Sequence, residues 1–491
     1  MKSKFSKVLS ILLSVVLVIS SFYLLYQVIR LNVLPSKFLF PLTIGVVVLD
    51  AIFILLLIYF SKNVVSKIVC ILLTLFICVA TCMGGYYISK TQNVLSNITN
   101  VAKHAKNTVS VIVKESSSIK NKSQLNDVSV GSLRLNEQGS KKVLKELSGE
   151  GIVLNQTEYD SMTALLEAFY NGEVDSIIIN ESSRSQILDM EAYSNFDSNT
   201  RVVYQTSYKV KNNDSATSVS DITSKPFNVL ISGSDTRGGF DENGRSDVIM
   251  IATVNPKTHT ILLTSVPRDF YVTTACDAGD GCMQGALDKI THTGIHGTNT
   301  TKRTVEQLLG IEINYTFKVG FDTVTELVDV LGGVDVYVEP GYATTTSEFS
   351  VHEGVNHLNA QQALAFARER YSYTEGDRQR TKNQQQVLMG IVKEATKPSV
   401  ITNYAAIMDT IANTFSTTMS NEEITDLIKY QLNNNPTWKM EQYMVDGTGD
   451  TLMCAELGDA ASVMVPDQST VKMAKDKINA VLAGKSSEDV Q

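Results

Sequence analysis

Three long apolar runs dominate the first ninety residues of the chain. They cover residues 8–29, 39–60 and 68–88, and each reaches the roughly 20 residues that a helix needs to cross a membrane. The first run lacks the small-residue cleavage pattern of a signal peptide, and three such runs in tandem argue against buried core helices. We therefore predict three transmembrane helices within residues 1–90.

Basic residues around these runs predict their orientation. Three lysines precede the first run and two lie in the loop after the second, whereas the first loop holds Arg30 and Lys37. Cytoplasmic loops carry an excess of Lys and Arg, so this bias favours a cytoplasmic N-terminus. Because the number of spans is odd, the large C-terminal part is then expected to be extracytoplasmic, in a multi-pass protein of the cell membrane.

After the apolar runs, the pattern changes to short strands that alternate with helices. The predicted strands are 107–115, 128–135, 174–180 and 200–206, and helix-like stretches lie at 138–148 and 159–172. This alternation predicts a small α/β accessory domain within residues 91–215, with linkers on either side. It contains neither paired carboxylates beside a nucleophile nor a glycine-rich phosphate loop, so we predict no catalytic role for it.

Residues 216–485 are expected to form a second and larger domain. Strongly β-prone stretches lie at 227–233, 246–254 and 260–267, and helix-like stretches lie at 301–309, 321–331, 359–369, 378–396 and 401–415. The mixed order of strands and helices predicts an α/β fold with a central mixed sheet covered by helices.

Arginine and aspartate recur at the ends of the three strands predicted for this domain. GSDTRGG follows the first strand, GRSD opens the second and VPRD closes the third. Strand ends are where α/β folds commonly build their sites. Any one of these segments could be a solvated loop, but together they favour one pocket of carboxylates and guanidinium groups in a chain whose formal net charge is −8.

The stretch FARERYSYTEGDRQRTKNQQQ concentrates further positive charge. On a helix of about 100° per residue, Asp377, Arg380 and Gln384 share one face, and Leu388 and Ile391 continue it. Polar groups on a stripe that becomes core need partners, because an unpaired buried charge is very costly. An internal salt bridge is the simpler explanation of the stripe, whereas the charged strand ends favour a site.

Such a pocket suits phosphate groups. The planar fork of arginine matches phosphate oxygens, and carboxylates suit Mg²⁺ when it is held together with substrate phosphates. Both point to phosphoryl transfer or pyrophosphate cleavage, in which catalysis is mostly positioning and charge neutralisation. The chain has no GxxxxGK[ST] loop, and a site outside the membrane would lack ATP, so the expected phosphate donor is a membrane lipid.

Cys276 and Cys282 bracket the short polar loop CDAGDGC. In an oxidising space, we expect them to form a disulfide. Metal binding is less favoured because no His or further Cys stands nearby at ligand spacing.

Five motifs of the larger domain together resemble the catalytic domain of the LytR–CpsA–Psr family. They are NVLISGSDTR, GRSDVIMIATVNP, LLTSVPRD, GFDTVTELVDVLGGVDVYV and LNAQQALAFARERYSYTEGDRQRTKNQQQ. The resemblance covers residues 226–400 and is expected to continue to about residue 485. Three spans and an additional outer domain are most similar to the capsule-type (CpsA-like) members of Gram-positive bacteria.

The resemblance implies an enzyme that moves a glycopolymer (capsular polysaccharide or teichoic acid) from a polyprenyl (undecaprenyl) pyrophosphate carrier to peptidoglycan. The new bond would be a phosphodiester to a muramic acid hydroxyl, and Mg²⁺ would assist. The implied pyrophosphate-binding residues are Arg245, Arg268, Arg368 and Arg370; the implied metal ligands are Asp235 and Asp247; and the implied catalytic residues are Asp377, Arg380, Gln384 and Asp247. The apolar tunnel that the family uses for the lipid tail has no assignable residues at this point.

One segment departs from the pattern of the family. KITHTGIHG retains Lys289, which is either a phosphate contact or an ordinary surface lysine, but has His292 and His296 where members carry small residues. We expect these two histidines to be loop residues and not metal ligands.

Two other functions stay open. A phosphatase acting on the lipid pyrophosphate would use the same groups, with water in place of the sugar hydroxyl. A non-enzymatic membrane regulator, such as a transcription attenuator, would need to grip DNA. The chain is acidic, lacks a helix-turn-helix signal and leaves little cytoplasmic protein, so no nucleic-acid partner is expected.

Overall fold

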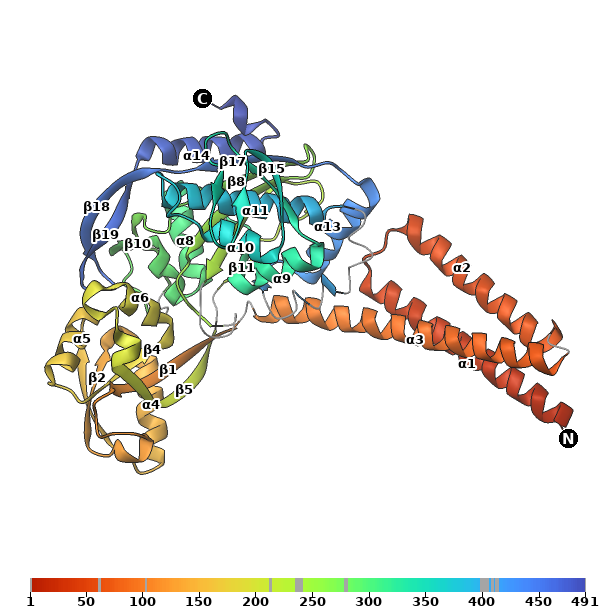
Figure 1. Ribbon diagram of the computed structural model, residues 1–491, viewed down its shortest axis with the longest axis horizontal. Coiled ribbons are helices and arrows are strands. Elements are labelled where there is room, and N and C mark those ends of the chain that lie inside the picture. Colours follow the sequence, from red (N-terminus) through yellow and green to blue (C-terminus); the bar gives the residue numbers. More distant parts are fainter. Residues whose placement is uncertain are drawn as a thin grey trace. The chain divides into compact units, whose positions relative to one another are not determined.

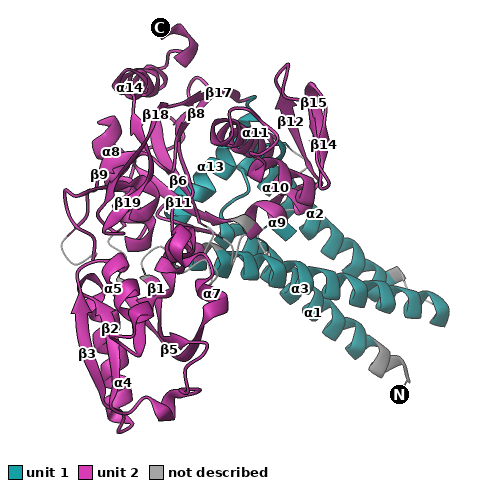
Figure 2. Ribbon diagram, turned by 60° about the vertical axis from the view of Figure 1, so that its left-hand side comes forward, with its two compact units in different colours: residues 1–97, 394–412, 420–437 teal, residues 98–393, 413–419, 438–491 magenta. Residues whose placement is uncertain are grey.

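The computed structural model describes residues 2–60, 63–101, 104–211, 214–234, 242–277, 281–397, 406–407, 410 and 415–490 (Figure 1). The chain divides into two compact units (Figure 2). The first unit comprises residues 1–97, 394–412 and 420–437, and the second comprises residues 98–393, 413–419 and 438–491.

The first unit contains the three apolar helices. They are α1 (Lys2–Leu31), α2 (Ser36–Leu55, followed by a π-helical turn at Leu56–Phe60) and α3 (Val64–Val101). All three are long and apolar enough to cross a membrane, which confirms the three predicted helices. The polar segment after the third apolar run is not a separate element, because α3 continues through it as far as Val101.

Polar side chains tie the three apolar helices together. Asp50 of α2 is buried, and its Oδ1 accepts a hydrogen bond of 2.9 Å from Ser21 Oγ of α1. Thr81 Oγ1 of α3 donates to Ser20 Oγ of α1, also at 2.9 Å. Such bonds join helices that lipid tails would otherwise surround, so α1 is the helix to which the other two are bonded.

The accessory domain (residues 104–211) is built on one five-stranded sheet. The strands, in the order β3-β2-β4-β1-β5 across the sheet, are β3 (Leu154–Tyr159), β2 (Val128–Leu133), β4 (Ser176–Asn180), β1 (His104–Lys114) and β5 (Thr200–Lys211). Helices α4 (Glu137–Gly149), α5 (Met162–Asn171), α6 (Arg184–Asp189) and α7 (Phe196–Asn199) connect them. Strand β3 was not predicted, because its residues are mostly exposed and polar.

The core of this domain has two parts, one between the strands and α4 and one between the strands and α5. Ile112, Ile177 and Ile179 of the strands pack against Leu165 and Phe169 of α5, and all five are fully buried. The buried residues follow the apolar periodicity from which these strands and this helix were predicted, so the elements form where they were expected.

The large domain is built on a six-stranded mixed sheet. In order across the sheet, its strands are β16 (Phe415–Thr417), β11 (Tyr315–Gly320), β6 (Phe227–Ser234), β7 (Val248–Asn255), β8 (Thr260–Val266) and β17 (Lys439–Met444). The pairs β6–β11 and β8–β17 are parallel, whereas β6–β7, β7–β8 and β11–β16 are antiparallel. The predicted mixed sheet is therefore confirmed.

Helices cover both faces of this sheet. One face packs Leu230 and Ile251 against α8 (Thr298–Leu309) and α14 (Gln468–Leu482). Successive strand residues point to opposite faces of a sheet. The side chains of Ile231 and Met250 therefore point to the other face, which is covered by a layer of three helices. That layer consists of α9 (Phe321–Leu331), α10 (Ala360–Arg368) and α11 (Asp377–Ala395).

Smaller elements complete the two units. In the large domain they are the strand pairs β9–β10 (Tyr271–Thr273, Leu287–Lys289), β12–β15 (Val334–Val338, Gly354–Leu358), β13–β14 (Thr344–Thr345, Ser350–Val351) and β18–β19 (Gly447–Cys454, Asp459–Pro466). Helix α13 (Asn421–Asn434) belongs to the first unit. The helix predicted at 401–415 falls mostly outside the described residues.

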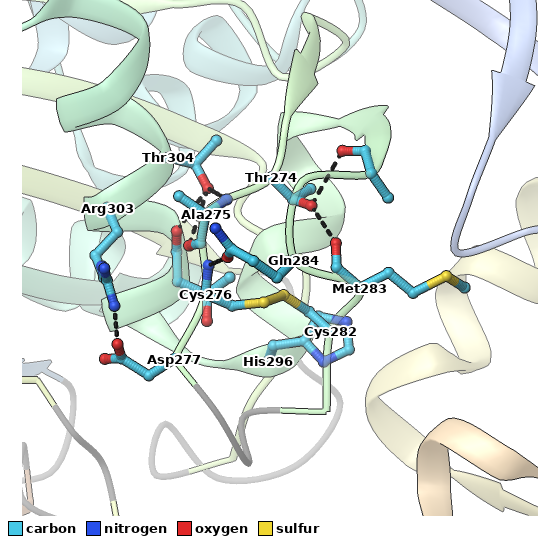
Figure 3. The surroundings of a disulfide bond; sticks show 12 residues. Thr274, Ala275, Cys276, Asp277, Cys282, Met283, Gln284, His296, Arg303 and Thr304 are labelled. Carbon is cyan, nitrogen blue, oxygen red and sulfur yellow. Dashed lines mark hydrogen bonds and ion pairs between the residues drawn. A yellow bond between two sulfur atoms is a disulfide. The ribbon is translucent and has the colours of Figure 1, made fainter.

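The predicted disulfide is present. Cys276 and Cys282 are joined, with their Cα atoms 6.4 Å apart. Figure 3 shows how the loop is anchored: Cys276 N donates to Gln284 Oε1 at 2.5 Å, and Ala275 N donates to Thr304 Oγ1 of α8 at 3.1 Å. The disulfide thus closes a loop whose base is held on α8.

Burial of one carboxyl makes the stability of the second unit depend on pH. Asp214 is buried beside β11, where its Oδ2 accepts a hydrogen bond of 2.6 Å from Thr316 Oγ1. Burial raises the pKa of Asp214 to about 6, against the opposing effects of Thr316 and Lys302. The folded state therefore binds this proton more tightly than the unfolded state, and the resulting stability is present below about pH 4 and lost as the pH rises through about 6.

Asp214→Asn, which is neutral at every pH, should therefore stabilise the second unit at pH 8. We expect a gain of about 3 kcal/mol, from a pKa shift of about two units at about 1.4 kcal/mol per unit, and no gain near pH 4. Thermal unfolding of the detergent-solubilised chain at both pH values measures this, with exposed Asp450→Asn as the control. An equal effect of Asp214→Asn at both pH values would contradict the assignment.

Candidate functional site

A polar cavity of about 360 Å³ lies at one edge of the sheet of the large domain. We call it the arginine cavity. Its lining residues are Asp247, Arg268, Arg368, Arg370, Tyr371, Arg380 and Gln384. All of them except Tyr371 are among the site residues predicted from the sequence.

The sheet brings the first two of these residues together. Asp247 directly precedes β7, and Arg268 follows β8. These strands are antiparallel neighbours in which Ile249 faces Val266. The start of β7 and the end of β8 therefore share one edge of the sheet, and the charged strand ends meet there.

The turn between α10 and α11 places the remaining three arginines, Arg368, Arg370 and Arg380, at the arginine cavity. Helix α10 begins at a capping box between Asn359 and Gln362 and ends at Arg368. Gly376 adopts a φ of +55°, in the left-handed region that favours glycine, and α11 starts at the next residue. This reversal places Arg368 and Arg370 beside the first turns of α11, which carry Arg380.

Asp247 and Arg268 form the innermost ion pair of the cavity. Arg268 Nη1 donates to Asp247 Oδ1 at 2.8 Å, and the side chains are 23% and 8% exposed. Burial alone would lower the pKa of Arg268, but Asp247 and Asp269 raise it above its ordinary value. Arg268 is therefore a permanent positive charge in a largely desolvated place, where electrostatic interactions are strong.

Asp377 at the start of α11 holds two other arginines. Its Oδ2 lies 3.1 Å from Arg380 Nη2, and its Oδ1 lies 3.4 Å from Arg370 Nη1. Burial and the nearby charges of Arg268 and Arg370 lower the pKa of Arg380, although Asp377 opposes them. The salt bridge expected on this helix is real, but it belongs to a cluster in which guanidinium groups repel one another.

The positive charges of the site outnumber its negative charges among the described residues. Four guanidinium groups line the arginine cavity, with Asp247 beside them and Asp377 in an adjoining pocket. Like charges this close are costly unless an anion neutralises them. The arrangement therefore suits an anion with several oxygens, such as a phosphate or pyrophosphate.

An apolar cavity adjoins the arginine cavity. Its lining residues are Ile231, Gly233, Ser234, Val248, Met250, Val319, Gly320, Val324, Leu364, Ala367, Gln384, Val387, Leu388 and Ile391. Gln384 lines both cavities. The stripe on α11 that begins with Asp377 thus runs from the charged cavity into the apolar one, through Leu388 and Ile391.

An apolar tunnel was expected from the family resemblance, but no residues were assigned to it, and Tyr371 was missed. Tyr371 is 84% exposed at the arginine cavity, its hydroxyl accepts a 2.7 Å hydrogen bond from Arg370 Nη2, and the guanidinium lies 4.8 Å from the ring centroid. A signal for covering layers was available in β7, which carries apolar residues on both faces and therefore needs a layer on both sides. No comparable signal marked Tyr371.

Among the described residues, the predicted site residues Arg245, Lys289 and Asp377 line neither cavity, although Asp377 lines the adjoining pocket. Arg245 is buried and forms an ion pair with Asp189 of the accessory domain, and it is not among the residues that line the arginine cavity. Lys289 Nζ lies 3.3 Å from Asp269 Oδ1, and Asp269 lines the pocket next to the arginine cavity. Asp235 falls outside the described residues.

The two histidines of the departing segment pair with carboxylates. His292 Nδ1 lies 2.7 Å from Asp288 Oδ1, and His296 Nε2 lies 3.0 Å from Glu456 Oε2. All four side chains are nearly buried. These pairs explain why the segment tolerates histidine where small residues were expected.

The carboxylates of the site fit Mg²⁺ only in company with a substrate. Across the part of the chain that the structure describes, no group of three or more His, Cys, Asp or Glu side chains could hold a metal ion. Asp247 and Asp377 each supply one carboxylate at the adjoining pockets. One or two carboxylates completed by phosphate oxygens and water is a common donor set for Mg²⁺.

Comparisons with known proteins identify the family of the chain. A family model described as the LytR_cpsA_psr family matches residues 192–480. A polyisoprenyl-teichoic acid–peptidoglycan teichoic acid transferase, TagU of Bacillus cereus (strain AH820), is 31% identical over 241 residues, which cover 48% of this chain and 76% of the relative. TagU of Bacillus subtilis (strain 168) is 34% identical over 203 residues, which cover 41% and 63%.

Solved structures also match. The crystal structure of B. subtilis TagU is 28% identical, covers 52% of this chain and 97% of its own, and has a TM-score of 0.41. That of protein gbs0355 from Streptococcus agalactiae is 24% identical, covers 54% and 91%, and has a TM-score of 0.45. Because the family model matches more than half of the sequence, the chain belongs to the LytR_cpsA_psr family.

Proposed function

We propose that the chain is a membrane-bound phosphotransferase that moves a glycopolymer from a polyprenyl pyrophosphate carrier to peptidoglycan. The observation that carries the proposal is a cavity lined by four arginines that shares Gln384 with an apolar cavity. The charged pyrophosphate and the hydrocarbon tail of the carrier would thus bind in two adjoining cavities. Relatives that are named teichoic acid transferases support the class of polymer and of acceptor.

Arg268, Arg368 and Arg370 are proposed to grip the pyrophosphate. Each guanidinium offers a planar pair of donors that matches two phosphate oxygens. Arg380 would face the reacting phosphorus, where negative charge grows in the transition state. A bound anion would relieve the repulsion among these guanidinium groups, so the same residues would bind the substrate and stabilise its charge.

The reaction consists of one displacement at phosphorus. The acceptor hydroxyl of peptidoglycan attacks the phosphorus next to the polymer, and the bond to the bridging oxygen breaks, so polyprenyl phosphate leaves. The polymer is then joined to the acceptor by a phosphodiester. Asp247 or Asp377 would take the hydroxyl proton, because both carboxylates line the pocket in which the phosphates would lie.

Mg²⁺ is proposed as the cofactor of this reaction. Asp247 and Asp377 would hold it together with the substrate, and Asp235 is the further ligand expected from the sequence. When bound, Mg²⁺ would neutralise charge on the phosphate oxygens.

The second unit is proposed to lie outside the cell. Lys37, in the first turn of α2, donates a 2.5 Å hydrogen bond to Asn433 O of α13, so the start of α2 and α13 belong on one side of the membrane. The lysine bias assigns that side to the exterior. The disulfide between Cys276 and Cys282 supports an oxidising compartment for the large domain.

Removing one pocket arginine should abolish transfer. We expect Arg268→Ala or Arg370→Ala to lower polymer attachment by at least about a hundredfold, since each loses transition-state charge stabilisation. Attachment of lipid-linked polymer to peptidoglycan fragments by the purified full chain measures this. Arg134→Ala, which removes an exposed accessory-domain arginine paired with Asp160, is the matched control. Near-normal attachment by either pocket variant would contradict the proposed function.

Filling the apolar cavity should weaken the use of long lipid carriers. Leu388→Trp adds bulk within that cavity, and we expect a roughly tenfold rise in KM for a long polyprenyl carrier because its buried apolar area shrinks. A carrier with a short prenyl tail should be affected much less. Leu388→Met preserves volume and serves as the control. Equal effects on both carriers would show that the tail binds elsewhere.

Chelation of Mg²⁺ should stop transfer, and its return should restore it. The same assay separates transferase from phosphatase: attached polymer is expected, and polymer released without joining glycan would favour the phosphatase. Asp247→Asn should raise the Mg²⁺ concentration needed for half-maximal rate, because one carboxylate ligand is lost. An unchanged rate in the presence of chelator would remove Mg²⁺ from the proposal.

A further inference from the structure

The segment that leads into Asp247 is buried without regular secondary structure. Residues 242–246 are all buried, and they run from the first described residue after β6 to the start of β7. Buried backbone of this kind must find its hydrogen-bond partners outside a helix or sheet. This segment leads directly into Asp247, which lines the arginine cavity. The contacts that fix the segment therefore also fix the position of Asp247 in the cavity.

Residues of the large domain hold one end of the segment. Ser246 N donates to Thr291 O at 3.0 Å, and Asp247 N donates to Gly233 O at 2.8 Å. A Cβ added to Gly294 would lie 2.5 Å from Gly244 O, so the chain after β10 packs closely against the segment. These contacts fix the end nearest the cavity.

At the other end, Lys318 of β11 donates to the Glu242 carbonyl, and residues of the accessory domain hold the charged side chains. Glu242, whose side chain is 11% exposed, accepts hydrogen bonds from Lys106 Nζ at 3.0 Å and from Thr108 Oγ1 at 2.6 Å. Lys106 also forms a backbone bridge with Glu242. Three residues after Glu242, Arg245 forms its ion pair with Asp189, the last residue of α6.

We propose that the accessory domain is a positioning element for the active site, acting through Lys106, Thr108 and Asp189 on the segment that carries Asp247. A nearly buried carboxylate and a nearly buried guanidinium would be costly without these partners. Their loss should therefore let the segment relax, and with it Asp247. The part of the proposal that concerns rate rests on the proposed transferase function.

Hydrogen exchange of the full-length protein tests the positioning directly. In Asp189→Asn, we expect the amides of Ser246 and Asp247 to exchange about tenfold faster, as befits one weakened charge-assisted hydrogen bond. Amides in the middle of β7 should keep their protection. Asp189→Glu, which retains the carboxylate at a side chain that is 60% exposed, should behave like the wild type.

Thr108→Val is a second and milder variant, because it removes one donor to Glu242 and changes little volume. Glu150→Gln breaks the exposed ion pair with Lys122 in the same domain and serves as the matched control. Unchanged exchange at Ser246 and Asp247 in both Asp189→Asn and Thr108→Val would overturn the proposal. Equal acceleration in Glu150→Gln would also overturn it, since the effect would then not come from these contacts.

Transfer kinetics provide the second readout. We expect Asp189→Asn to lower kcat about tenfold with KM for the lipid-linked polymer within about twofold, because the substrate still meets the arginines of the cavity. Rescue by Asp189→Glu should accompany it. Faster exchange with normal kinetics would overturn a role in catalysis. If the wild type itself transfers no polymer, the proposed function fails, while the exchange result still decides the positioning role.

Discussion

The central constraint on the site of the second unit is a cluster of guanidinium groups in a partly desolvated cavity. Arg268 and Arg380 are mostly buried, and each lies near the other's positive charge. Such crowding is tolerable only because Asp247 and Asp377 lie among the arginines and because the site is open to an anion. The sheet edge and the α10–α11 turn therefore hold together, at fixed positions, like charges that would otherwise move apart.

The same constraint explains why the charged cavity adjoins an apolar one. The stripe of α11 that faces the pockets changes from Asp377 and Arg380 to Leu388 and Ile391 within about four turns, and Gln384 stands at the change. A neutral amide at that point can face both environments at little cost. An amphiphile with a charged head and a hydrocarbon tail is the class of ligand that such a helix can accommodate along its length.

The contacts of the accessory domain give this chain a further means of controlling the site. Arg245 belongs by its position in the sequence to the charged strand ends, yet its charge is directed to Asp189. Glu242 is likewise satisfied by Lys106 and Thr108. The wall of the arginine cavity is thus held from two domains, which links a domain without catalytic residues of its own to the geometry of the reaction.

Much of the fold was predictable because it follows from local periodicity. The three apolar helices, the strands β6, β7 and β8, and the helices α8 to α11 all lie near their predicted bounds. Elements without a strong apolar period were missed. Strand β3 is polar and mostly exposed, and the strands β17 to β19 have at most two buried residues each.

The sequence by itself determined the membrane helices, the mixed α/β class, the family and the kind of residue that forms the site. These follow from patterns that a single stretch of chain carries, such as the apolar period or the spacing of Asp377, Arg380 and Gln384. Only the tertiary structure decided that Arg245 pairs with Asp189, that Tyr371 stands at the cavity, and which side chains line its apolar neighbour. Those facts depend on segments that are distant in sequence and meet only after folding, and a charged side chain takes whichever opposite charge the fold brings nearest.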